Sequence, residues 1–243
     1  MILSAAALLA GAMLWFSHEE GTRGEPSASG ELPALGLMTT LPIYWNEAAS
    51  IDEMLGDDAQ QHWARTALEQ EFRLLPLDTL SDQGGLDGVG FLLLAQPRAL
   101  SPEENVALDE WVRAGGKLLL LADPLLTGES RFHIGDRRRP QDVALLSPIL
   151  ARWGLELEFD EAQDGAERIV TDGEITFPVR LAGSWRASTG ECNVAAVTVI
   201  ARCTIGSGQV LAIADAAILE LDHHESDNSD ALGQLVRLAF DSP

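Results

Sequence analysis

Residues 89–122 constrain the fold most strongly, because they encode a strand, a helix and a second strand in close succession. The segments Val89–Ala95 and Lys117–Ala122 are apolar almost throughout, as in strands that are buried on both faces of a parallel sheet. Between them, Ser101–Glu104 forms a capping box with proline at the first helical position, and Gly115-Gly116 ends the helix. This βαβ unit predicts a doubly wound α/β sheet in the N-terminal half.

Apolar periodicity predicts further elements on both sides of this unit. The second half is rich in short strands, which Gly and Asp turns separate. We expect helices within 58–72, 145–153 and 230–240, and strands at 37–43, 73–77, 155–159, 168–171, 175–181, 194–202 and 209–214.

The N-terminus carries a membrane signal. Ile2–Phe16 is an uncharged apolar run, shorter than the roughly 20 residues of a typical spanning helix, and it is not preceded by Lys or Arg. An uncleaved anchor is favoured, and a cleaved signal peptide remains the alternative. We therefore expect an anchor or signal at 1–17, a Gly/Pro/Ser-rich linker at 18–36 and an α/β domain at 37–243. That domain would face the periplasm or another extracytoplasmic space, tethered to an inner membrane that the chain crosses once.

Charge and composition exclude two classes of protein. The 243 residues carry a formal charge of −22, whereas a nucleic-acid binder needs a basic surface. The apolar content of 46% is too high for a disordered acidic tail. Cys192 and Cys203 are the only cysteines, and the sequence leaves open whether they form a disulfide or stay two buried thiols.

Motifs for nucleotide or covalent chemistry are not found. The single lysine, Lys117, is followed by leucines and cannot belong to a phosphate-binding loop. The glycines of the GGLDGVG segment precede a strand, whereas a dinucleotide-binding fingerprint follows one. No Gly-x-Ser-x-Gly elbow occurs. We therefore expect a binding role without a cofactor and without enzymatic activity.

The long loop after Ala122 holds the main binding candidates, Asp123, Asp136, Arg137 and Arg138. Ligands of open α/β sheets bind beyond the carboxyl ends of the strands, and this loop leaves such an end. Consecutive arginines in so acidic a chain indicate an anionic ligand or an acidic partner. An ion-pair patch within the protein is the alternative.

A second cluster, Asp222, His223, His224 and Asp227, lies in a polar loop before the last predicted helix. Imidazoles and carboxylates could bind a divalent metal there, and the alternative function is thus a metal-assisted hydrolase. The simpler interpretation is a solvated acidic loop, because Asn228 stands where a zincin motif has its second histidine.

Five segments carry a family resemblance: GFLLLAQP at 90–97, LSPEE at 100–104, LDEW at 108–111, GGKLLL at 115–120 and IGSGQVLAIAD at 205–215. They resemble the class I glutamine amidotransferase-like fold, which has a flavodoxin-like sheet. More narrowly, they are similar to the extracytoplasmic domain of gliding-motility-type auxiliary proteins of uncharacterised ABC transport systems. The resemblance implies an accessory role with separate permease and ATPase subunits. It supplies no catalytic residue, because the strand at Lys117–Ala122 runs into Asp123-Pro124 and not into a cysteine elbow.

Overall fold

The structure is a computed structural model that describes residues 32–45, 47, 61–81, 85–188, 190–220 and 225–241. The chain divides into two compact units, Met1–Glu31 and Leu32–Pro243, and the second unit is described below. The predicted anchor or signal at 1–17 lies outside the described residues. Within the described ranges, no helix has the length and apolar character that crossing a membrane requires.

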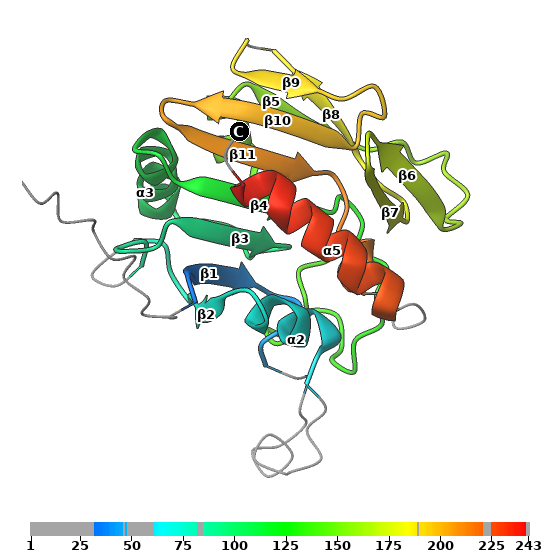
Figure 1. Ribbon diagram of the computed structural model, residues 1–243. Helices are drawn as coiled ribbons and strands as arrows, with labels where there is room; N and C mark the ends of the chain where they lie inside the picture. Colours follow the sequence, from blue (N-terminus) through cyan, green and yellow to red (C-terminus); the bar gives the residue numbers. More distant parts are fainter. Residues whose placement is uncertain are drawn as a thin grey trace, which may run out of the picture. The chain divides into compact units, whose positions relative to one another are not determined.

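A central sheet forms the second unit, with seven strands among the described residues (Figure 1). The strand order is β2-β1-β3-β4-β11-β10-β9. The first five strands in this order are parallel, and β10 and β9 extend the sheet in antiparallel orientation. The predicted α/β class with a parallel sheet is confirmed. The bounds are β1 Ala34–Thr39, β2 Arg73–Pro76, β3 Phe91–Ala95, β4 Lys117–Leu121, β9 Cys192–Val194, β10 Ile200–Ile205 and β11 Gly208–Ile213.

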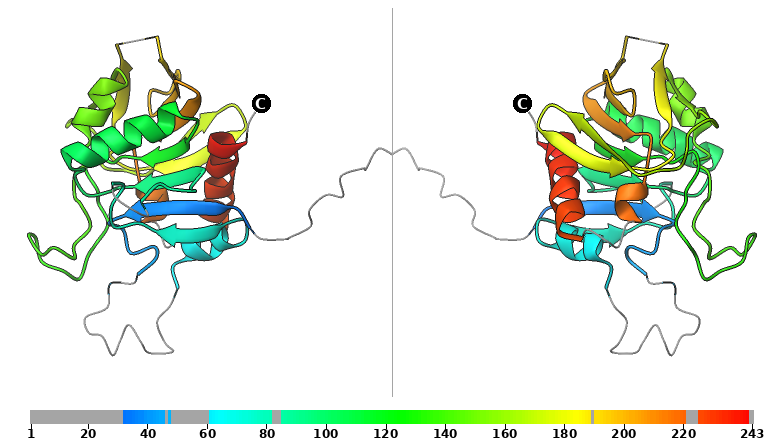
Figure 2. Two further views of the ribbon diagram at one scale, coloured as in Figure 1. Left: turned by 90° about the vertical axis from the view of Figure 1, so that its left-hand side faces the viewer. Right: turned by 90° about the vertical axis from the view of Figure 1, so that its right-hand side faces the viewer.

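Helices cover both faces of the sheet. Helices α2 and α5 contact each other on one face, and α3 and α4 contact each other on the other (Figure 2). The bounds are α2 Trp63–Glu69, α3 Pro102–Arg113, α4 Ser147–Arg152 and α5 Glu225–Phe240, with a short 3₁₀ helix, η1, at Ala217–Leu219.

The capping box predicted for α3 is present. Ser101 Oγ accepts a hydrogen bond from the Glu104 amide at 3.2 Å, and the Glu104 carboxylate accepts one from the Ser101 amide at 2.8 Å. After the helix, Gly115 has φ +116°, a conformation that side chains with a Cβ rarely adopt. These local interactions fix both ends of α3, so the βαβ unit forms where the sequence predicts it.

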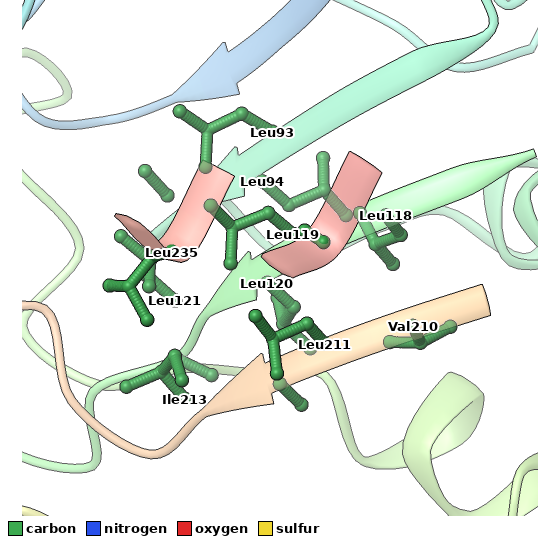
Figure 3. Close-up of a cluster of buried hydrophobic side chains, with 14 of the residues drawn as sticks. Leu93, Leu94, Leu118, Leu119, Leu120, Leu121, Val210, Leu211, Ile213 and Leu235 are labelled. Atoms are coloured by element: carbon green, nitrogen blue, oxygen red, sulfur yellow. The ribbon is translucent and has the colours of Figure 1, made fainter. Parts of the chain in front are cut away.

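The core lies where α5 packs on the central strands. Figure 3 shows Leu235 of α5 over the leucines of β3 and β4, with Leu211 and Ile213 of β11 beside them. Leu92–Leu94 and Leu118–Leu121 are all at most 1% exposed. Because consecutive residues point to opposite faces of a strand, both faces of β3 and β4 are buried, as their continuous apolar runs predict.

Two small antiparallel pairs pack beside the main sheet. They are formed by β5 (Leu155–Glu158) with β8 (Ser184–Ala187), and by β6 (Arg168–Asp172) with β7 (Ile175–Val179). The sequence did not predict β8. The strand expected from residue 37 begins three residues earlier, as β1 at Ala34.

The strand predicted at 194–202 is wrong, because it is divided between β9 and β10. The Thr198 amide donates to Ala195 O at 2.9 Å and closes a tight turn, in which Thr198 has φ +55°. No Gly, Pro or Asn marks this turn in the sequence. Across the resulting hairpin, Cys192 lies directly opposite Cys203, and the two form a disulfide.

Candidate functional site: the carboxyl edge of the sheet

The strand order locates the place where ligands usually bind in such a sheet. The chain goes from β1 to β2 on one side and from β3 to β4 on the other, so the direction of winding changes between β1 and β3. A crevice is expected there, beyond the carboxyl ends of the strands. The residues that follow β1, β3, β4 and β11 therefore form the candidate site.

The protein's own chain closes this crevice. Gln96, directly after β3, is fully buried and has φ +44°. Its Nε2 donates to Gln141 O at 2.8 Å and to Asp123 O at 3.1 Å, while its Oε1 accepts from the Asp123 amide at 2.8 Å. Thr40 Oγ1, after β1, donates to Gln96 O at 2.6 Å and accepts from the Gln141 amide at 2.9 Å. Gln141 is thus bonded through both of its backbone groups across the top of the crevice.

Asp123 connects the carboxyl ends of β4 and β11. It is 1% exposed. One carboxylate oxygen accepts from the Leu125 amide at 2.8 Å and the other from the Ala216 amide at 3.1 Å. The sequence predicted Asp123 as a ligand or partner contact, whereas the structure uses both of its oxygens to hold the protein's own loops.

Asp215 has the position after β11 that Asp123 has after β4. It is also 1% exposed, and its carboxylate accepts from the Ala217 amide at 2.7 Å and from the Arg180 amide at 2.9 Å. The sequence analysis did not select it. Ala-Asp directly follows the apolar runs of both β4 and β11, and this shared pattern is the signal that could have identified the pair.

Burial governs the electrostatics of these acids. It is the main cause that raises the pKa of Asp123 to about 7, and the nearby Glu220 carboxylate contributes to this rise. Burial and the charge of Asp123 raise the pKa of Asp215 well above its usual range. Burial also raises the pKa of Glu220, whose Oε2 accepts a hydrogen bond from Thr127 Oγ1 at 3.2 Å. The loops at this edge are therefore held by carboxyl groups that bind protons more tightly than exposed acids do.

The other predicted residues of the loop remain at the surface. Arg138 pairs with Asp136 at 2.8 Å and lies over the Phe132 ring at 4.1 Å. This guanidinium holds the pKa of Asp136 at about 2. Arg137 is exposed. The ion pair agrees with the alternative of an internal charge patch for Arg138, while Arg137 stays available at the surface.

The predicted metal cluster falls mainly outside the described residues, which exclude Asp222, His223 and His224. Asp227 is described and lies exposed on α5. Over the described ranges, no group of three or more His, Cys, Asp or Glu side chains is arranged to hold a metal ion. The hydrolase hypothesis remains an untested prediction.

Comparison with known proteins adds a family and a fold. The family model described as "ABC-type uncharacterized transport system" matches residues 32–174. A search of curated proteins finds no match. The exo-β-1,4-mannosidase Op5Man5 from Opitutaceae bacterium strain TAV5 is similar with a TM-score of 0.51 and 13% identity, over 85% of this chain and 36% of the mannosidase.

A β-galactosidase from Rahnella sp. R3 is similar with a TM-score of 0.50 and 14% identity, over 86% of this chain and 32% of that enzyme. The chain thus spans about a third of the length of these two enzymes. At this identity the likeness shows a shared fold alone.

Proposed function

The chain belongs to the family of the ABC-type uncharacterized transport system, whose model covers more than half of it, and from this premise we propose that it is a non-enzymatic accessory domain of such a system. The closed crevice is the observation that carries this proposal. At the place in the sheet where other α/β proteins bind small ligands, the side chains of Gln96 and Thr40 hold the backbone of Gln141. A domain whose usual ligand site is filled in this way acts through its outer surfaces.

We propose that the fold of this domain is flavodoxin-like and similar to that of the class I glutamine amidotransferases. Numbered in chain order, the five parallel strands have the spatial order 2-1-3-4-5, which is the flavodoxin-like arrangement. We assign no catalytic residue to the domain. The strand end at which a catalytic elbow would be sought instead carries the buried Asp123, with both oxygens bonded to backbone amides.

The disulfide supports an extracytoplasmic location. Cys192 and Cys203 are joined between β9 and β10, and such bonds persist in oxidising compartments such as the periplasm. With residues 1–17 as an uncleaved anchor, the chain would be a single-pass inner-membrane protein with its main domain outside the cytoplasm.

Both ends of the described domain lie at the amino edge of the sheet. Leu35 near the start pairs with Phe91, and Phe91 pairs with Lys117 on the next strand. Lys117 Nζ donates to Phe240 O, at the end of α5, at 2.7 Å. A tether at either end would therefore leave from this edge (Figure 1). We place the partner contact at the opposite, carboxyl edge, where the long loop carries the exposed Arg137.

Crosslinking of the full-length chain in native membranes, with mass spectrometry of the captured proteins, tests the proposal. We expect the permease and the ATPase of an ABC system to be recovered. Arg137→Glu should reduce their recovery, because it reverses a charge at the proposed contact. Arg168→Glu, at another exposed arginine on β6, should not. Capture of neither the permease nor the ATPase would contradict the accessory role. An equal loss of recovery in both variants would contradict the contact site at Arg137.

A further inference from the structure

Asp123 and Asp215 lie beside each other at the carboxyl edge of the sheet. Strands β4 and β11 pair in parallel, with Leu121 opposite Ile213, and each aspartate stands two residues beyond this pair. Neighbouring strands lie about 4.8 Å apart. The Ala216 amide, next to Asp215, donates to Asp123 Oδ2 at 3.1 Å, so the two chains stay close beyond their last pair. Two buried carboxyl groups this close repel each other strongly when both are ionised.

The two aspartates join three segments that cover this edge, namely the long loop of residues 124–142, η1 and the stretch after β7. All four of their carboxylate oxygens accept hydrogen bonds from backbone amides of these segments. The donors are the amides of Leu125 in the long loop, of Ala216 and Ala217 at η1, and of Arg180 after β7. The protonation state of the pair therefore acts on all three segments at once.

The first half of the long loop is attached to the domain through acidic side chains. The hydrogen bonds are those of the Leu125 amide with Asp123 at 2.8 Å, of Thr127 Oγ1 with Glu220 at 3.2 Å and of the Arg131 amide with Glu47 at 2.9 Å. At its far end, Gln141 is held by the neutral side chains of Gln96 and Thr40. Only the first of these two attachments can respond to pH.

The charged groups that face the pair do not neutralise it. Burial is the main cause that raises the pKa of Asp123 to about 7 and that of Asp215 well above its usual range, and the carboxylate of Glu220 contributes to both rises. Burial also raises the pKa of Glu220, and the charge of Arg180, after β7, opposes this rise. In the long loop, Arg139 is paired with Asp142. Among the side chains that the structure describes, no cation forms an ion pair with either aspartate.

Hydration is the available way to relieve ionisation of the pair. Because β4 and β11 are inner strands, the two carboxylates cannot move apart while the sheet stays intact. Water stabilises both charges once a covering segment lifts. Residues Ala217–Leu219 of η1 belong to the core and are at most 2% exposed, whereas many residues of the long loop are exposed. The long loop is therefore the segment that lifts at the lower cost in free energy.

We propose that Asp123 and Asp215 form a proton-dependent latch, which keeps the long loop docked while the pair is protonated and releases the loop as the pH rises. The docked state binds a proton more tightly than the lifted state does, so low pH favours it. For each proton released, the ratio of lifted to docked loop should rise about tenfold per pH unit between the ordinary pKa of an aspartate, about 4, and the pKa of about 7 in the docked state. The latch rests on contacts within this chain and does not depend on the transport partnership proposed above.

Hydrogen exchange of the purified full chain at pH 5, 6 and 7, measured by NMR, tests the latch. Each rate is compared with that of an unstructured peptide at the same pH, so the protection factor reports opening of the structure alone. Protection of the Leu126 and Gln141 amides, whose hydrogen bonds hold the two ends of the loop, should fall about tenfold per pH unit. Protection of the Ala114 amide, at the C-terminal end of α3, should stay constant. Constant protection of the two loop amides would overturn the latch.

Low concentrations of urea separate lifting of the loop from unfolding of the domain. Global unfolding exposes far more surface than lifting of one loop does. Urea should therefore accelerate exchange of the Leu93 amide, in the buried strand β3, and have little effect on the loop amides. A response of the loop amides as strong as that of Leu93 would overturn the latch, because the loop would then leave only when the whole domain unfolds.

Substitutions assign the effect to the pair. Asp123→Asn should remove most of the pH dependence of loop protection. The matched control is Asp164→Asn, because Asp164 also accepts from the amide two residues on but is exposed, and it should behave like the unmodified chain. Asp215→Asn removes the neighbouring charge and should also weaken the dependence, which keeps the test decisive if D123N does not fold. Full pH dependence in D123N or D215N, or its loss in D164N, would overturn the latch.

Discussion

Glu104 holds three parts of the chain with one carboxylate. It caps α3 through the Ser101 amide, and it accepts from both terminal nitrogens of Arg98 at 2.7 and 2.8 Å. It also accepts from the Leu80 amide at 3.1 Å, while its own side chain is only 3% exposed. The hydrogen bonds from Arg98 are the main cause that lowers the pKa of Glu104 to about 2, and burial opposes this shift.

Replacing Glu104 with Gln should therefore destabilise the domain. The amide nitrogen of Gln would face N–H donors, so we expect a loss of about 1–3 kcal/mol at pH 7, with partly exposed Arg98 keeping the loss modest. The lowered pKa stabilises the fold above pH 4.5, and this contribution disappears as the pH falls from 4.5 to about 2. Urea unfolding at pH 7 and pH 3 checks both effects. Glu110→Gln, at an exposed acid of the same helix, should change little. An equal loss in both variants at pH 7 would refute this account of Glu104.

Local signals explain which elements could be predicted. The unit β3-α3-β4 followed from its capping box, its glycine pair and its apolar runs, which all act within a few residues. The closed crevice depends on contacts across long separations, such as Gln96 with Gln141, 45 residues away. Residues 124–142 have no apolar period, so the sequence marked them as a loop and could not show where the loop packs.

The buried acids that follow β4 and β11 lead to a prediction of how the stability of the domain depends on pH. Because burial raises the pKa of Asp123 to about 7, the folded state binds a proton more tightly than the unfolded state does. Stability from this group is present at low pH and falls as the pH rises from about 4 towards 7. Asp123→Asn should flatten this decline by on the order of 1 kcal/mol or more, in urea unfolding between pH 4.5 and 7.5. Asp87→Asn, at an exposed acid, is the control. Parallel curves of stability against pH for the unmodified chain and D123N would show that Asp123 does not titrate in this range.

At the scale of the whole molecule, a charge of −22 opposes the compact state. Salt screens this repulsion, and the screening length falls from about 30 Å at 0.01 M to about 3 Å at 1 M. Salt also weakens the surface ion pairs, but exposed pairs such as Arg186 with Glu158 contribute only about 0–1 kcal/mol each. The repulsion acts over the whole surface, so its screening should be the larger effect.

We therefore expect the melting temperature of the full chain to rise between 10 mM and 0.5 M NaCl, each kcal/mol gained giving about 2–4 °C. Sodium chloride is the right salt, since sulfate also stabilises folded proteins by exclusion from their surfaces. Calorimetry of the full chain at both salt concentrations measures this effect. A melting temperature that falls with NaCl would mean that the ion pairs outweigh the repulsion.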